Sequence, residues 1–205
     1  GDYSGRSGSL MFAGTDGESQ VITVPITNES RVEIAETFQL LLENIHDTDS
    51  PVLIKKETGI ATIINDDYAS ISISDTSLNE SQGTMTFTVQ LDNDVDAEVQ
   101  VYYETADGSA TTADLDYTTS GGLLTFTGYA GETQEITVNI TDDNKLELNE
   151  SLVVNLNNLV LNGMTNQDAA GSPLVTIADD QGTGTIFNDD VASLTIDDVI
   201  INENS

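Results

Sequence analysis

The chain has 205 residues, of which 36 are Asp or Glu and only 5 are Lys or Arg, for a formal net charge of -31. A surface this negative repels nucleic acid and anionic lipid headgroups, which excludes both as direct partners. Hydrophobic residues make up 38% of the chain and occur in short alternating runs, a pattern typical of a folded protein.

The excess of carboxylates predicts bound cations. Two carboxylates about 4 Å apart at a surface-like dielectric repel each other by roughly 4 kcal/mol. The 5 basic side chains cannot neutralise 36 acidic ones. Divalent cations are therefore the expected counterions.

Several residue types are missing or rare, and their scarcity excludes whole classes of chemistry. The chain has no Cys, so disulfides, thiol catalysis and thiolate metal sites are excluded. His46 is the only histidine, which leaves no zinc site and no His-based triad. Aromatic residues are only 5%, with no Trp for a sugar-binding cleft. We expect no enzyme, and without a run of 18 apolar residues we expect no direct membrane insertion.

Residues 1–67 are predicted to form the later part of a β domain. When the sequence is shifted so that Asp2 meets Asp116, Ile22-Thr23-Val24 aligns with Ile136-Thr137-Val138, and the match continues without gaps to Asn44. Repeats of this length indicate tandem domains, because solenoid units are only about 20 to 50 residues long. This segment would therefore lack the early strands of its repeat.

Residues 68–190 are predicted to form one complete domain of about seven short strands. Their apolar side chains alternate with polar ones, as half-buried strands require. Gly, Asp, Asn and Thr separate the runs, and no helical stripe appears. The predicted fold class is all-β, with tandem immunoglobulin-like antiparallel β-sandwiches. The alternating positions include Ile71, Ile73, Met85, Phe87, Val89, Leu91, Val99, Val101, Tyr103, Leu124, Phe126, Ile136, Val138, Ile140, Leu152, Val154, Leu156 and Ile186.

Residues 191–205 are predicted to be the first strand of a following repeat. In a second register Asn65-Asp66-Asp67 aligns with Asn188-Asp189-Asp190, and Ala69-Ser70 with Ala192-Ser193. The register differs because an insert at about residues 157–181 is longer than its counterpart. We interpret the chain as part of a longer repetitive protein. The open sheet edge of residues 1–67 could also accept this strand from another copy, by strand addition.

Acidic residues concentrate at the turns of the complete repeat. In a sandwich, several of these turns can converge at one end, where six to eight oxygen ligands would suit calcium. Acidic turns are also often only solvated, and Asp-Gly is a turn signal. Asp116-Tyr117 is interpreted as a strand start with a packed ring, and Gly131-Glu132 as a tight hairpin. The acidic turns are Asn79-Glu80, Asp107-Gly108, Asp142 to Glu150, and Asn188-Asp189-Asp190.

Together these motifs resemble the Calx-beta family, the β-sandwich domains of sodium-calcium exchangers, integrin β4 and large bacterial surface proteins. The resemblance covers the whole chain and implies calcium (Ca2+) binding. It rests on the segments Tyr103 to Ala110, Asp116-Tyr117, Gly131-Glu132-Thr133, Asp142-Asp143-Asn144 with Glu147 and Glu150, and Gly184 to Asp190.

The resemblance also implies a set of metal ligands. Asn144 and Asn188 stand where the exchanger domains carry Asp, which implies fewer or weaker ions, and Asn28 replaces the leading Asp of the first segment. The implied ligands of the complete repeat are Glu80, Asp107, Asp142, Asp143, Glu147, Glu150, Asp189 and Asp190. Those of the first segment are Glu29, Glu33, Glu36, Asp66 and Asp67.

Composition and resemblance favour a calcium-rigidified spacer or adhesion module of a large extracellular, cell-surface protein. Its expected partners are calcium ions and the adjacent repeats of the same chain. Two alternatives stay open: a calcium-sensing regulatory domain of a membrane protein, and an accessory module of a secreted enzyme.

Overall fold

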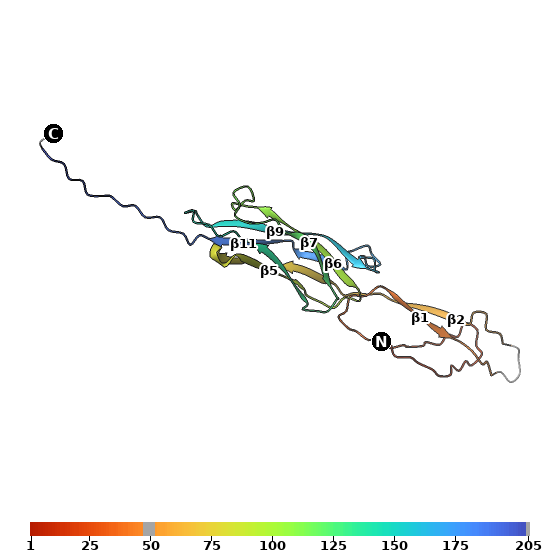
Figure 1. Cartoon of the computed structure of the whole chain (residues 1–205). Helices are drawn as coiled ribbons and strands as arrows, with labels where there is room; N and C mark the ends of the chain where they lie inside the picture. The colour runs from red at the N-terminus through yellow and green to blue at the C-terminus, as the bar shows by residue number, and fades with distance from the viewer. Residues whose placement is uncertain (47–51, 204–205) are drawn as a thin grey trace.

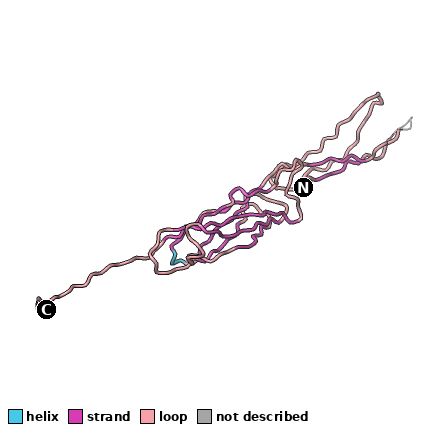
Figure 2. The backbone as a smooth tube through the Cα atoms, turned by 90° about the horizontal axis from the view of Figure 1, so that it is seen from above, coloured by secondary structure: helices cyan, strands magenta, loops and turns pink. Residues whose placement is uncertain are grey.

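The computed structural model describes residues 1–46 and 52–203, and these form an elongated molecule (Figure 1). A β-sandwich occupies its centre, residues 1–67 lie at one end, and residues 191–203 leave the other end as an extended tail (Figure 2). In the described part of the chain, no helix is long and apolar enough to cross a bilayer. The last two residues of the predicted third repeat, Asn204 and Ser205, lie outside the described residues.

Two sheets face each other in the sandwich, as predicted for this fold class. The first has the order β10-β3-β5-β8 and the second the order β4-β11-β9-β6-β7. The first sheet comprises β3 (Ala69–Ile73), β5 (Thr84–Leu91), β8 (Thr133–Asn139) and β10 (Val175–Asp179). The second comprises β4 (Thr76–Asn79), β6 (Glu98–Asp107), β7 (Gly121–Phe126), β9 (Glu150–Asn162) and β11 (Gln181–Phe187).

Strict alternation along β5 builds the centre of the core. Met85, Phe87, Val89 and Leu91 are buried, and the polar residues between them are exposed. Because successive side chains of a strand point to opposite faces, this pattern gives one apolar face. That face packs against the second sheet, where β11 approaches closely: a Cβ atom on Gly184 would lie 2.3 Å from Met85 Sδ.

The sandwich has nine strands between residues 69 and 187, all of them described, where about seven were predicted. The predicted first strand is divided, because the chain changes sheets between β3 and β4. Asp75 lies between these two strands, and its Oδ1 stabilises the crossing to the second sheet by accepting a hydrogen bond from the Thr183 N–H of β11 at 2.7 Å. The insert also contributes β10. As a result, β10 with β3 and β11 with β4 are parallel pairs in a sandwich predicted to be antiparallel.

The first segment contains β1 (Glu36–Leu41) and β2 (Thr58–Ile63), which pair antiparallel. Tyr3 stacks on Phe38, with ring centroids 4.5 Å apart. Residues 22–24 form no strand, although their counterparts 136–138 lie in β8. The reason is pairing: residues 136–138 hydrogen-bond to β5, and this chain holds no counterpart of β5 for residues 22–24.

Candidate metal centre

Acidic side chains from three loops meet at the end of the sandwich from which the tail leaves. Because β4 and β11 are parallel, the loops after both strands share this end. Glu80 follows β4 in a short 3-10 turn (Glu80–Gln82), and its carboxylate forms two groups with the acidic pairs that follow β8 and β11. In each group the ligand oxygens lie within 4.8 Å of one another: Glu80, Asp143 and Asp190 in one; Glu80, Asp142 and Asp189 in the other.

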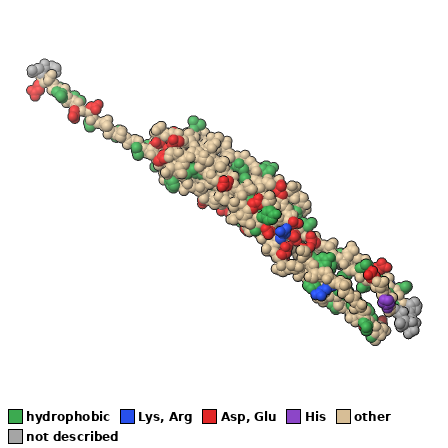
Figure 3. Space-filling view, turned by 60° about the horizontal axis from the view of Figure 1, so that its bottom comes forward, with side chains coloured by type: hydrophobic (Ala, Val, Ile, Leu, Met, Phe, Trp, Pro, Cys, Tyr) green, Lys and Arg blue, Asp and Glu red, His purple; other side chains and the backbone are tan. Residues whose placement is uncertain are grey.

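A third group lies beside the first two and consists of Asp116, Glu147 and Glu150. A narrow pocket of ≈ 10 Å³ joins the groups, since Glu80, Asp116 and Asp143 all line it together with Glu147 and Glu150. That volume corresponds to about one water-sized particle. We call the eight acidic residues of these three groups the distal site. Figure 3 shows acidic side chains gathered at this end and at the junction with the first segment.

Buried oxygens without partners test whether the distal site fits a cation. Glu80 is only 5% exposed, and its Oε1 has no hydrogen-bond partner; the buried Asp190 Oδ2 has none either. Buried carboxylate oxygens are normally paired, because an unpaired one retains its desolvation cost. Among the described residues, the one ion pair at this site joins Lys145 to Glu147. The donor set is all hard oxygen and fits calcium.

The pKa values of two carboxyls show the electrostatic cost of this arrangement. Burial, and then contact with Asp190 and the charges of Asp189 and Asp143, raise the pKa of Glu80 to about 7. Burial, and then the charge and contact of Asp116, raise the pKa of Glu150 to about 7. Without a cation, these two groups are therefore partly protonated near neutral pH.

Asn188 braces the site through its amide. Its Oδ1 accepts a hydrogen bond from the Glu147 N–H at 3.0 Å, and its Nδ2 donates to the Asp190 carbonyl at 3.1 Å. An ionised Asp could accept the first bond but could not donate the second. Besides the weaker ion binding that the resemblance implies, the amide therefore connects the acidic loop of Glu147 to the segment that follows β11. Sequence reasoning did not predict this role.

The structure separates Asp107 from the other predicted ligands. Asp107 Oδ1 accepts hydrogen bonds from the Tyr117 hydroxyl at 2.6 Å and from the Thr112 N–H at 3.1 Å, and Asp107 belongs to none of the acidic groups found among the described residues. These bonds fix the loop that carries Asp116. Burial raises the pKa of the Tyr117 hydroxyl in this arrangement.

Asp116 is the acidic residue of the distal site that sequence reasoning missed. Its neighbour Tyr117 is buried, as the interpretation of a packed ring requires. The carboxylate of Asp116, however, faces Glu147 and Glu150. Its repetition as Asp2 in the earlier copy was the signal that could have marked it. Gly131-Glu132 forms a tight turn but no hairpin, because β7 and β8 on either side of it belong to different sheets. Glu132 Oε2 holds this turn by accepting hydrogen bonds from the Thr127 and Gly128 N–H groups at 2.7 and 3.2 Å.

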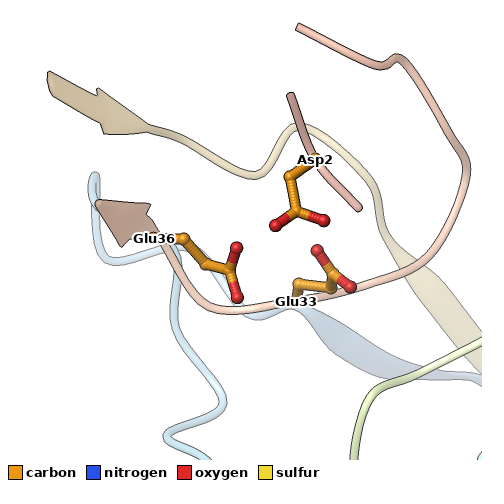
Figure 4. A group of neighbouring side chains, drawn as sticks. All are labelled: Asp2, Glu33 and Glu36. Carbon is orange, nitrogen blue, oxygen red and sulfur yellow. The ribbon is translucent and has the colours of Figure 1, made fainter. Parts of the chain in front are cut away.

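The first segment carries a matching group of three carboxylates, Asp2, Glu33 and Glu36, which point toward one another (Figure 4). We call these three residues the seam site. In the repeat alignment they are the counterparts of Asp116, Glu147 and Glu150. Burial raises the pKa of Glu33, and contact with Asp2 raises that of Glu36. Around them is a cavity of ≈ 300 Å³, also lined by the other predicted ligands Glu29, Asp66 and Asp67.

Asn65 makes the same two hydrogen bonds at the seam site that Asn188 makes at the distal site. Its Oδ1 accepts a hydrogen bond from the Glu33 N–H at 3.0 Å, and its Nδ2 donates to the Asp67 carbonyl at 2.8 Å. The two sites therefore share their acidic trio and the amide that fixes it. The chain builds the same structure twice, one repeat apart.

Comparisons with known proteins identify what the chain is similar to. The sequence profile of the Calx-beta domain matches residues 1–67 and 65–181. Among solved structures, the apo form of the Calx CBD1 domain is 24% identical, with a TM-score of 0.49, over 60% of this chain and 100% of that one. A two-domain structure, calcium binding domain CBD12 of CALX1.1, is also 24% identical with a TM-score of 0.49, over 66% of this chain and 53% of that one. No curated protein matches the chain.

Proposed function

Since the chain belongs to the Calx-beta family, we propose that it is a calcium-binding module that stiffens an array of such domains. The observation that carries this proposal is Glu80: it is buried, lacks a partner for Oε1, and faces four acidic side chains from two other loops. A divalent cation supplies the missing positive charge.

Eight residues would hold calcium at the distal site: Glu80, Asp116, Asp142, Asp143, Glu147, Glu150, Asp189 and Asp190. Bound calcium supplies charge neutralisation there. The chain's own contribution is to bring these loops together: Ser81 donates a hydrogen bond to Asp189, and Asn188 joins the loop of Glu147 to the end of β11. Without neutralisation, repulsion among the carboxylates would loosen these loops.

Stiffening follows from where the two sites lie. Asp189 and Asp190 are the last residues of the complete repeat, and Asp66 and Asp67 hold the same place one repeat earlier. Neutralising either group fixes the short connection that leaves its domain. Such a module would serve as a spacer or adhesion segment at a cell surface, where weak extracellular calcium sites are filled at about 0.1 to 1 mM calcium. We propose no catalytic role.

Calorimetric titration of calcium into the metal-free protein, paired with small-angle X-ray scattering, tests this function. We expect saturable calcium binding. Chelation should lower the melting temperature and increase the maximum dimension or its spread. Magnesium at equal concentration is the control, since it keeps its waters and prefers a smaller, regular site. Identical scattering and melting curves with and without chelator would contradict the proposal.

A further inference from the structure

The first segment inserts one side chain into the sandwich. Val32 lies in the acidic loop next to Glu33, is 0% exposed, and belongs to the hydrophobic core of residues 69–187. It forms a parallel bridge with Val95, in the turn between β5 and β6. The Val32 N–H donates to the Asp94 carbonyl at 2.8 Å, and the Asp96 N–H donates to the Val32 carbonyl at 2.9 Å.

Charge accompanies this apolar contact. Arg31 of the first segment forms an ion pair with Asp96 of the sandwich at 3.6 Å. The receiving turn is itself held in place, because the Val95 N–H donates to the Gly128 carbonyl at 2.8 Å and the Ala130 N–H donates to Asp94 Oδ1 at 2.7 Å. We call Arg31 with Val32 the knob, and the turn Asp94-Val95-Asp96 the socket.

The complete repeat carries its own copy of the knob. In the repeat alignment Arg31 and Val32 correspond to Lys145 and Leu146, again a basic residue followed by a branched aliphatic one. These positions hold two of the chain's 5 basic residues. Unlike Val32, Leu146 is 60% exposed, and Lys145 pairs only with the neighbouring Glu147 among the ion pairs of the described residues. Among the described residues, no socket therefore receives the second knob.

The path of the chain beyond the second knob is also repeated. Asn188 fixes Asp190 as Asn65 fixes Asp67, so the two connections leave their domains in the same way. Residues 191–203, whose sequence repeats that of 68–80, then run outward with exposed apolar side chains such as Leu194 and Ile196. This is the pattern of β3 and β4 without the strands they pair with.

We propose that Lys145 and Leu146 dock into the next repeat, at the turn equivalent to the socket Asp94-Val95-Asp96. The partner is thus a further Calx-beta domain that begins with residues 191–203. Leu146 packs against the counterpart of Val95 in that turn, and Lys145 forms an ion pair with the counterpart of Asp96. Successive domains then meet through one repeated contact, which gives the array a regular shape. The inference rests on the tandem arrangement in the proposed function but not on calcium binding.

Disulfide trapping tests the docking cleanly because the chain has no native Cys. Residues 1–190 are joined to a second copy of residues 68–205, which places a socket after the second knob. Leu146→Cys is combined with Val95→Cys in the appended copy, and oxidised glutathione serves as the oxidant. The pair Val32→Cys and Val95→Cys in the original chain is the positive control. Strands that pair lie about 4.8 Å apart, within the reach of a disulfide.

Leu148→Cys with the same Val95→Cys is the matched negative control. Leu148 is 85% exposed, and its counterpart Ile34 stays 55% exposed at the seam although it lies only two residues from the knob. We expect the Leu146 pair to cross-link about tenfold faster than the Leu148 pair, because docking raises the effective concentration of the two thiols. Equal rates for the two pairs would overturn the proposal.

Two further measurements separate docking from folding and from calcium. Circular dichroism checks that the Val95→Cys variant remains folded. Should it unfold, Leu146→Asp and Leu148→Asp are compared in the tandem chain by small-angle scattering. Only Leu146→Asp should widen the distance distribution, and equal distributions for the two variants would overturn the proposal.

Cross-linking is run with calcium and with chelator. Equal trapping in both supports docking and counts against calcium stiffening alone, whereas no trapping in either overturns docking while calorimetry still reports on calcium.

Discussion

At the scale of single residues, Glu80 combines burial with a carboxylate oxygen that lacks a hydrogen-bond partner. Its contribution to calcium binding can therefore be separated from its effect on stability. We predict that Glu80→Gln weakens calcium binding about tenfold or more, equivalent to about 1.4 kcal/mol, since it removes one charged ligand shared by two acidic groups. The metal-free protein should melt no lower than the wild type, because the change also removes repulsion. Calorimetry measures the affinity. Glu135→Gln, an exposed position on β8, removes the same charge and should leave the affinity unchanged.

The raised pKa values of Glu80 and Glu150 predict how the stability of the metal-free protein depends on pH. Both values rise from 4.5 to about 7 on folding, so between these limits the folded chain binds more protons than the unfolded one. The free energy of unfolding should therefore fall as pH rises through this window. Melting curves from about pH 5 to about pH 8 without calcium check this, and the double variant Glu80→Gln, Glu150→Gln should flatten the trend. A slope that survives in the double variant would assign it to other groups.

At the scale of elements, alternation in the sequence predicted the strands that have one buried face. β5 shows this most clearly, since every second residue from Met85 to Leu91 is buried. β4 and β10 were not predicted, because each has only one buried residue, whereas the equally short β3 alternates along its whole length. Their parallel pairing also depends on distant strands. Residues 22–24 show the converse: their sequence repeats that of a strand, but strand formation also needs a partner to pair with.

The site was predictable to the extent that its residues come from recognisable turns. The resemblance implied Glu80 and the acidic pairs at 142 and 189, and the fold brings them together. Asp116 was not predicted as a ligand, since Asp followed by a packed Tyr also describes an ordinary strand start. The roles of Asn188 and Asn65 depend on hydrogen bonds across 41 and 32 positions of sequence, which a linear pattern does not reveal.

The close approach of β11 to β5 predicts that the domain does not tolerate a methyl group at Gly184. A Cβ atom there would lie 2.3 Å from Met85 Sδ and 2.8 Å from Phe87 Cζ. Gly184→Ala should lower the free energy of unfolding by about 1 to 3 kcal/mol through overpacking, measured by urea denaturation. Gly59→Ala in β2 is the control, because its Cβ would meet only Leu40 Cβ at 4.0 Å. Equal effects of the two changes would argue against a steric cause.

At the scale of the whole molecule, a net charge of -31 on 205 residues opposes compaction, and the acidic side chains gather where domains end. Only 5 basic residues counter this charge, and the two at the knobs lie beside these same acidic loops. The same connections therefore carry both the strongest repulsion and the contacts that hold neighbouring domains together. Conditions that screen charge should act first at these connections.

Salt should therefore substitute in part for calcium. Raising NaCl from about 0.1 M to about 1 M shortens the Debye length from about 10 Å to about 3 Å. We predict that this raises the melting temperature of the metal-free protein and narrows its distance distribution, because carboxylates at the distal and seam sites repel one another less. The calcium-loaded protein should change much less, since its carboxylates are already neutralised. Scanning calorimetry and small-angle scattering measure both forms in parallel. Equal shifts in the two forms would show that repulsion at these sites does not control the stiffness of the chain.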